Sequence, residues 1–237
     1  MFPDNQLIKY YIATYGEVVG GDCYLFKHWK SDFFDYIVDI GANVGAFVNY
    51  ANMRHPDAKI FAYEPYEDAY NCLVYQYGFI GNIILKNECV GDGSLLALRD
   101  MGNVGQNQFL AESECGLINA QDDHSTTRVK SVSLGDIFTQ NEISLDKKYF
   151  IKMDCEGGER FLLTDPQSIE IIKNSCGFSV EIHFPGGNRI GQYFKIFPAW
   201  SVYNAWMHDN FEQSHNIIYH KSRRASGCGI YVLQQKQ

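Results

Sequence analysis

Four ionisable side chains stand near the ends of two apolar runs in the second half of the chain: Lys152 and Asp154 on one run, Glu181 and His183 on the other. In a β-strand, residues two apart project from the same face, so each pair points in one direction. If the two strands are neighbours, all four groups converge. Such a cluster suits proton transfer, because an imidazole titrates near neutral pH and a carboxylate accepts protons.

A glycine-containing turn in the first half of the chain has the form of a ligand cradle. The apolar run 36–40 ends at Gly41, and Gly45 follows. Glycines let a strand turn into a helix without a Cβ clash, and we expect them to leave backbone N–H groups open to a ligand. Asp39 places a carboxylate where a core favours an aliphatic side chain, so we expect it to face a polar ligand. Glu64 stands about 20 residues further on, where an acidic group commonly meets a pair of ribose hydroxyls.

Alternating strands and helices must position these residues. We expect strands at 36–40, 59–64, 82–87, 148–154 and 177–183, helices at 4–15, 44–54 and 66–78, and a final antiparallel hairpin from 216–219 and 228–233. The alternation predicts right-handed crossovers and a parallel sheet. A ligand of such a sheet lies outside the carboxyl ends of its strands. Asp92, beyond the third strand, either borders that ligand or caps a turn.

Three blocks in order, Asp39–Gly45, Tyr63–Pro65 and Ile151–Glu159, resemble the FkbM family of S-adenosylmethionine-dependent methyltransferases. The resemblance implies an α/β fold: a single Rossmann-like class I methyltransferase domain, with helices on both faces of a mostly parallel seven-stranded sheet that ends in an antiparallel hairpin. It implies S-adenosylmethionine as the cofactor. It also implies a strand at 129–134 before a short helix, where Gly135 interrupts the family's usual Leu-Asp pattern and puts a role for Asp136 in doubt. The cofactor-binding residues would come from the three blocks and the turn after the third strand: Asp39, Gly41, Asn43, Gly45, Glu64, Asp92 and Asp154.

The resemblance also implies that the methyl acceptor is a hydroxyl of a sugar, glycan or related small metabolite. A hydroxyl has a pKa far above neutral, so a base must take its proton as it attacks. Our hypothesis is that Asp154 and His183 flank this hydroxyl and that Glu181 orients His183. Glu156 would position the acceptor or the methionine amino group. Lys152 completes the candidate catalytic set, and an ion pair with Glu181 is its structural alternative.

Other functions fit parts of the same pattern. An NAD-dependent oxidoreductase also uses a strand–turn–helix and an acidic ribose contact, but Asn43 stands where a second glycine is usual and would obstruct a pyrophosphate. A non-catalytic Rossmann-like binding module would keep the fold without the chemistry; the intact Asp39, Glu64, Asp154 and Glu156 argue against it. The same carboxylates could hold a divalent metal, which their spacing does not favour.

Size and composition limit the remaining classes. We expect 237 residues, 46% of them hydrophobic, to form an N-terminal helical extension (1–30) and one domain (31–237), with 100–127 as a lid or insertion loop. The net charge of 20 − 28 = −8 argues against a nucleic-acid partner. Seven scattered cysteines and the lack of a signal peptide or long apolar run predict a cytoplasmic protein with reduced thiols, no structural zinc and no membrane span. The oligomeric state is not readable.

Overall fold

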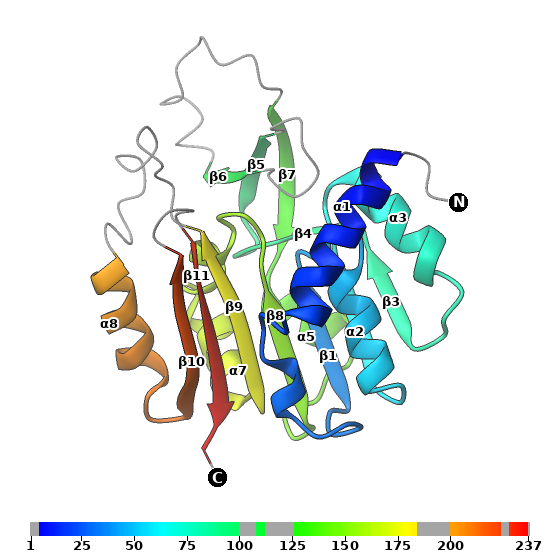
Figure 1. The fold of residues 1–237 in the computed structure, drawn as a ribbon. Coiled ribbons are helices and arrows are strands. Elements are labelled where there is room, and N and C mark those ends of the chain that lie inside the picture. Colours follow the sequence, from blue (N-terminus) through cyan, green and yellow to red (C-terminus); the bar gives the residue numbers. More distant parts are fainter. Residues whose placement is uncertain (1–4, 100–107, 112–125, 184–199, 224–227, 237) are drawn as a thin grey trace.

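The computed structural model describes residues 5–99, 108–111, 126–183, 200–223 and 228–236, and its centre is a seven-stranded sheet (Figure 1). In chain order the strands of this sheet are β1 (Tyr36–Ile40), β2 (Lys59–Tyr63), β3 (Ile83–Lys86), β8 (Tyr149–Met153), β9 (Gly177–His183), β10 (His215–Arg223) and β11 (Cys228–Gln235). Across the sheet they run in the order β10-β11-β9-β8-β1-β2-β3.

The pairing of these strands confirms the predicted architecture. The strands from β9 through β8, β1 and β2 to β3 pair in parallel, whereas β11 pairs antiparallel with both β9 and β10. The expected strands of the sheet are present within one or two residues of their predicted ends, apart from the hairpin, whose strands are longer than expected. The sheet is therefore mostly parallel and ends in an antiparallel hairpin.

Helices cover both faces of the sheet (Figure 1). One face carries α2 (Ala46–Arg54) and α3 (Glu67–Tyr77), together with the N-terminal segment that includes α1 (Asn5–Tyr15), the π-helix η1 (Gly16–Gly20) and the short 3-10 helix η2 (Phe26–His28). The other face carries α5 (Leu134–Gln140), α7 (Pro166–Asn174) and α8 (Trp200–Phe211).

Side-chain alternation along the strands accounts for the two layers. In β1, Ile37 packs in the cluster beneath α2, whereas Val38 and Ile40 pack in the cluster beneath α5 and α7. In β8, Phe150 packs in the cluster beneath α2 and Ile151 in the cluster beneath α5 and α7. Both faces of the parallel strands are thus buried, as the apolar runs predicted. Asp39 shares the face of Ile37, where its carboxylate interrupts the apolar layer.

A smaller four-stranded sheet stands beyond the carboxyl end of β3. It consists of β4 (Cys89–Val90), β5 (Leu95–Arg99), β6 (Gln108–Ala111) and β7 (Thr126–Val132), in the order β4-β7-β5-β6. The strand expected at 129–134 is the second half of β7, while β4, β5 and β6 were not expected. Residues 100–107 and 112–125, most of the expected lid, lie outside the described residues.

Two further expectations bear on this region and on the compartment. Asp136, whose role the sequence left in doubt, forms a capping box with Ser133 at the start of α5. Within the described ranges, every helix is too short or too polar to cross a bilayer. Five cysteines of the described part of the chain are free thiols: Cys23, Cys72, Cys89, Cys155 and Cys176.

The strand order determines where a ligand can enter. From β1 the chain proceeds to β2 and β3 on one side, and later returns to β8 and β9 on the other. At such a reversal the connections diverge to opposite faces and leave a crevice at the carboxyl ends of the strands. The ends of β1, β2, β8 and β9 should therefore share one site.

Candidate active site

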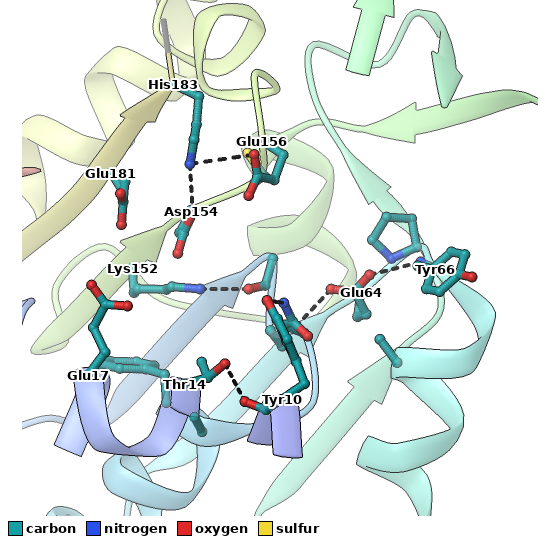
Figure 2. Close-up of a pocket in the computed structure, with 18 of the residues that line it drawn as sticks. Tyr10, Thr14, Glu17, Glu64, Tyr66, Lys152, Asp154, Glu156, Glu181 and His183 are labelled. Atoms are coloured by element: carbon teal, nitrogen blue, oxygen red, sulfur yellow. Dashed lines mark hydrogen bonds and ion pairs between the residues drawn. The ribbon is translucent and has the colours of Figure 1, made fainter. Parts of the chain in front are cut away.

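A cavity of about 330 Å³ lies at these carboxyl ends (Figure 2). Its lining includes all five candidate catalytic residues: Lys152, Asp154, Glu156, Glu181 and His183. It also includes four of the seven candidate cofactor residues: Gly41, Asn43, Glu64 and Asp154. The candidate catalytic residues of β8 and β9 converge because these strands are parallel neighbours and residues two apart lie on one face. The structure thus brings together residues more than 140 positions apart in the chain.

The turn after β1 differs from its prediction in one respect. The five consecutive N–H groups from Gly41 to Gly45 each donate to an acceptor of the protein itself: Tyr63 O twice, Glu64 Oε2, Asn43 Oδ1 and Ala42 O. The prediction that this turn leaves its backbone N–H groups open to a ligand is therefore wrong. The turn shapes the cavity wall but offers no vacant N–H groups for a phosphate, which such sites require.

The two glycines of this turn are needed for packing and for backbone conformation. Gly41 has φ +75°, and a Cβ there would lie 1.8 Å from the carbonyl oxygen of Asp154. Gly45 has φ +93°, and its Cβ would lie 2.4 Å from a ring carbon of Tyr77 on α3. Both positions exclude a side chain. Gly41 lines the cavity, whereas Gly45 faces α3 and is outside the described lining.

Glu64 is held by backbone donors from both sides. Its Oε2 accepts from Asn43 N at 2.8 Å and its Oε1 from Tyr66 N at 2.9 Å. The residue is 8% exposed, and burial raises the pKa of its carboxyl to about 7, although these two hydrogen bonds act to lower it. Each oxygen keeps a second lone pair, so Glu64 can still accept hydrogen bonds from a ligand hydroxyl.

Asp39 does not reach the cavity. It is fully buried, and its Oδ1 lies 3.0 Å from Lys152 Nζ on the neighbouring strand, where the register pairs the two residues. Burial raises the pKa of the Asp39 carboxyl, and Lys152 opposes the rise. Lys152 Nζ also donates to Gly41 O at 2.6 Å. The predicted contact of Asp39 with the cofactor is therefore replaced by a buried ion pair that supports the turn from beneath.

Asp92 also lies away from the cavity. It is exposed, and its Oδ1 accepts from Ser94 N at 2.9 Å. This is the turn aspartate that the sequence left as the alternative. It stands beyond β4 at the edge of the smaller sheet, outside the described cavity lining.

His183 contacts three carboxylates at the other half of the cavity. Its Nδ1 lies 3.1 Å from Glu159 Oε1, and its Nε2 lies 3.7 Å from Asp154 Oδ1 and 3.6 Å from Glu156 Oε2 (Figure 2 shows the last two contacts). Glu159 is thus a carboxylate at hydrogen-bond distance from the imidazole, and the orienting role of Glu181 stays a prediction.

Glu159 is a functional candidate that sequence reasoning quoted only as part of a motif. It begins the short helix α6 (Glu159–Leu162), is 2% exposed, and accepts from Cys155 N at 2.8 Å and Gly157 N at 2.9 Å. It thereby closes the turn after β8, in which Glu156 has φ +48°. Its spacing from Asp154 in the sequence is compatible with this role, but nothing local indicated the contact with His183.

The carboxylates control the protonation of this group. Burial acts to lower the pKa of His183, but Glu159, Glu156 and Asp154 together raise it well above its usual value. Burial raises the pKa of the Glu156 carboxyl to about 8, with His183 opposing and Asp154 reinforcing the shift. At neutral pH the imidazole therefore holds a proton, and the Glu156 carboxyl is largely protonated as well.

The same group includes three potential metal ligands. Ligand atoms of Asp154, Glu159 and His183 lie within 4.8 Å of one another, a spacing that one divalent cation can bridge. However, both Glu159 oxygens already accept backbone hydrogen bonds, and one of them also contacts Nδ1 of His183. A cation would have to displace these contacts, so the donor set fits a metal poorly.

The N-terminal segment supplies a further part of the cavity wall. The lining residues from this segment are Tyr10, Ala13, Thr14, Glu17 and Tyr24. Tyr10 Oη accepts from the side-chain amide of Asn43 at 3.0 Å, which joins α1 to the glycine turn. Sequence reasoning identified none of these residues, because their helical spacing indicates only an amphipathic element.

Comparison with known proteins gives one family. The family model described as a methyltransferase FkbM domain matches residues 39–213 of the chain, which is more than half of it. No curated protein matches the chain in sequence. Among solved structures it is similar to a SAM-dependent methyltransferase from Aquifex aeolicus, with 11% identity, 93% of each chain covered and a TM-score of 0.43. It is also similar to human N-acetylserotonin methyltransferase in complex with SAM, with 10% identity, 98% of this chain and 56% of that chain covered and a TM-score of 0.40.

Proposed function

Because the chain belongs to the FkbM methyltransferase family, we propose that it uses S-adenosylmethionine to methylate a hydroxyl of a sugar, glycan or related small metabolite. One observation carries the proposal: a single cavity joins the turn at Glu64 to the acidic group around His183. A methyl transfer needs both halves, because the donor and the acceptor must lie close together and apart from water.

The residues around Glu64 fit the adenosyl part of the cofactor. Small side chains, Ala42, Ala46 and Ala69 beside Gly41, leave room along the wall. Glu64 has one free lone pair on each oxygen for a ribose hydroxyl, and Asn43 and Tyr66 border it. When bound, the cofactor supplies an electrophilic methyl group on a sulfonium.

The acidic group around His183 fits the acceptor. In this proposal Asp154 and Glu156 bind the acceptor hydroxyl, and one of them takes its proton as the oxygen attacks. Only the ionised form of Glu156 can take this proton, and because its pKa is about 8 that form increases as the pH rises through 8. His183, already protonated, is a donor that orients the acceptor oxygen and offsets the negative charge. This keeps the hypothesis that Asp154 and His183 flank the hydroxyl, and makes His183 the donor of the pair.

The saturated glycine turn weighs against a nicotinamide cofactor. A dinucleotide places its pyrophosphate on free N–H groups at the start of the first helix. Here the N–H groups from Gly41 to Gly45 already have acceptors within the protein. A cofactor without phosphate, held through carboxylate and amide side chains, suits this wall better.

Calorimetric titration of the full chain tests the cofactor. We expect S-adenosylmethionine and S-adenosylhomocysteine to bind and NAD to give no heat. Saturable binding of NAD alone would overturn the proposal.

Transfer of a labelled methyl group to a panel of monosaccharides, glycosides, nucleotide sugars, phenols and amines tests the acceptor. We expect methyl ethers, and N-methyl products alone would contradict the hydroxyl part. His183→Ala should abolish transfer, whereas His208→Ala, at an exposed histidine of α8, should not change it.

A further inference from the structure

The N-terminal segment does more than cover the cavity. Tyr24 belongs to the residues ahead of the family match, which begins at residue 39. Its phenol nevertheless donates a short hydrogen bond to Oδ2 of Asp154, 130 positions away in the sequence. A group outside the family domain thus holds the carboxylate at the centre of the proposed acceptor site.

Tyr24 is itself fixed by three elements of the fold. It is 3% exposed, and its ring packs edge-on against Phe47 of α2, with 5.7 Å between ring centroids. Lys152 Nζ of β8 lies 5.6 Å from the ring centre, and Ser179 Oγ of β9 donates to the Tyr24 carbonyl at 2.9 Å. A phenol clamped in this way can hold its partner in one orientation at little further entropic cost.

The two oxygens of Asp154 have different partners. Oδ2 accepts from Tyr24, and Oδ1 lies 3.7 Å from Nε2 of His183. The Asp154 side chain is 25% exposed, so it borders the cavity without being free in solvent. Rotation about the Cβ–Cγ bond of Asp154 would turn the carboxylate plane away from His183, and the hydrogen bond from the Tyr24 phenol opposes this rotation.

We propose that Tyr24 is a positioning residue, which fixes the Asp154 carboxylate so that Oδ1 faces the acceptor side of the cavity. This rests on the function proposed above. Burial and the nearby Asp154 raise the pKa of the Tyr24 phenol well above its usual value, so it stays a donor throughout the working pH range. The N-terminal segment is then part of the reaction site rather than an appendage.

A ratio of two affinities tests this inference without a known acceptor. Sinefungin carries an ammonium group where S-adenosylmethionine carries its methyl sulfonium, and S-adenosylhomocysteine carries neither. The ratio of their dissociation constants, measured by calorimetry on the full chain, reports how well a carboxylate is aimed at the transferred group. For Tyr24→Phe, which keeps the packed ring, we expect the preference for sinefungin to fall about five- to tenfold, the size expected for loss of one ordinary hydrogen bond.

A double-mutant cycle separates positioning from general damage. Asp154→Asn should lower the same preference, and Tyr24→Phe combined with Asp154→Asn should lower it no further, because Tyr24 acts through Asp154. Tyr50→Phe is the matched control, because the Tyr50 phenol, like that of Tyr24, donates to a carboxylate. Its acceptor is Asp22 Oδ1 at 2.9 Å, and Tyr50 does not line the cavity. It should leave the ratio unchanged.

The outcomes are distinguishable. If neither analogue binds the unaltered protein, the proposed function fails and this inference fails with it. If both bind and only Asp154→Asn changes the ratio, Tyr24 does not position Asp154, and the proposed function stands. If Asp154→Asn also leaves the ratio unchanged, the carboxylate does not face the transferred group, which overturns the inference.

Discussion

The carboxyl of Glu64 should make cofactor binding depend on pH. A ribose hydroxyl donates hydrogen bonds, so it favours the ionised form of Glu64, whose pKa in the folded protein is about 7. If only the ionised form binds, the apparent dissociation constant is multiplied by 1 + 10^(pKa − pH). Between pH 8 and pH 6 this factor rises from about 1.1 to about 11, so the affinity should fall about tenfold.

Calorimetry with S-adenosylhomocysteine at pH 6, 7 and 8 measures this dependence. Glu64→Gln should bind the ligand more weakly at pH 8 and should lose most of the pH dependence, because an amide does not titrate. Glu67→Gln, at an exposed position in the first turn of α3, is the matched control and should keep the tenfold fall. An unaltered protein whose affinity is the same at pH 6 and pH 8 would refute the ribose contact of Glu64.

The same pKa shift affects the stability of the unliganded fold. Burial raises the pKa of Glu64 from 4.5 to about 7, so the folded state holds this proton more tightly than the unfolded chain does. The resulting stabilisation is complete below about pH 4.5 and is lost as the pH rises through 7. A shift of this size corresponds to roughly 3 kcal/mol. Urea unfolding of the unaltered protein and Glu64→Gln at several pH values isolates the contribution of this one group.

Four other perturbations test the site. Gly41→Ala should cost at least about 2 kcal/mol in urea unfolding, because its Cβ would meet Asp154 O at 1.8 Å; an unchanged midpoint would contradict the close approach of β1 and β8. Lys152→Met should cost about 3–5 kcal/mol by leaving Asp39 buried and unpaired, and the added change Asp39→Leu should recover most of that loss. Glu159→Gln should cost about 1–3 kcal/mol, since an amide accepts only one of the two backbone hydrogen bonds, and thermal unfolding would detect it. Exhaustive chelation should leave methyl transfer within about twofold of its initial rate; a loss restored by Mn²⁺ would show that a metal takes part.

The strands and the catalytic group were predictable for the same reason. Buried parallel strands read as apolar runs, so a charged residue within or just after one stands out, as Lys152 and Asp154 do. The alternation of side chains along a strand then places each charged residue on one face of the sheet. Parallel pairing of β8 with β9 brings Glu181 and His183 to the same cavity as Lys152 and Asp154. Periodicity and topology were enough for this part.

The partners of these groups were not predictable, because they depend on contacts between distant parts of the chain. Asp39 looked like a ligand contact but faces Lys152 across a strand pair, which a single strand pattern does not reveal. Tyr24 and Tyr10 are two of many tyrosines, and only the tertiary fold distinguishes them. The smaller sheet was missed because its strands are short and separated by polar segments. Glycine at positions 41 and 45 indicated a turn correctly, but not that its N–H groups would be saturated.

The cavity is lined by two different stretches of the chain, the N-terminal segment and the carboxyl ends of the sheet strands. The sheet edge that carries Asp154, Glu156 and His183 lies within the family match, whereas Tyr10, Glu17 and Tyr24 precede it. Substitutions at the lining residues of α1 and η1 should therefore change the shape of the cavity without replacing Asp154, Glu156 or His183. A designed change of selectivity would begin with these positions and would keep Tyr24, because its phenol contacts Asp154.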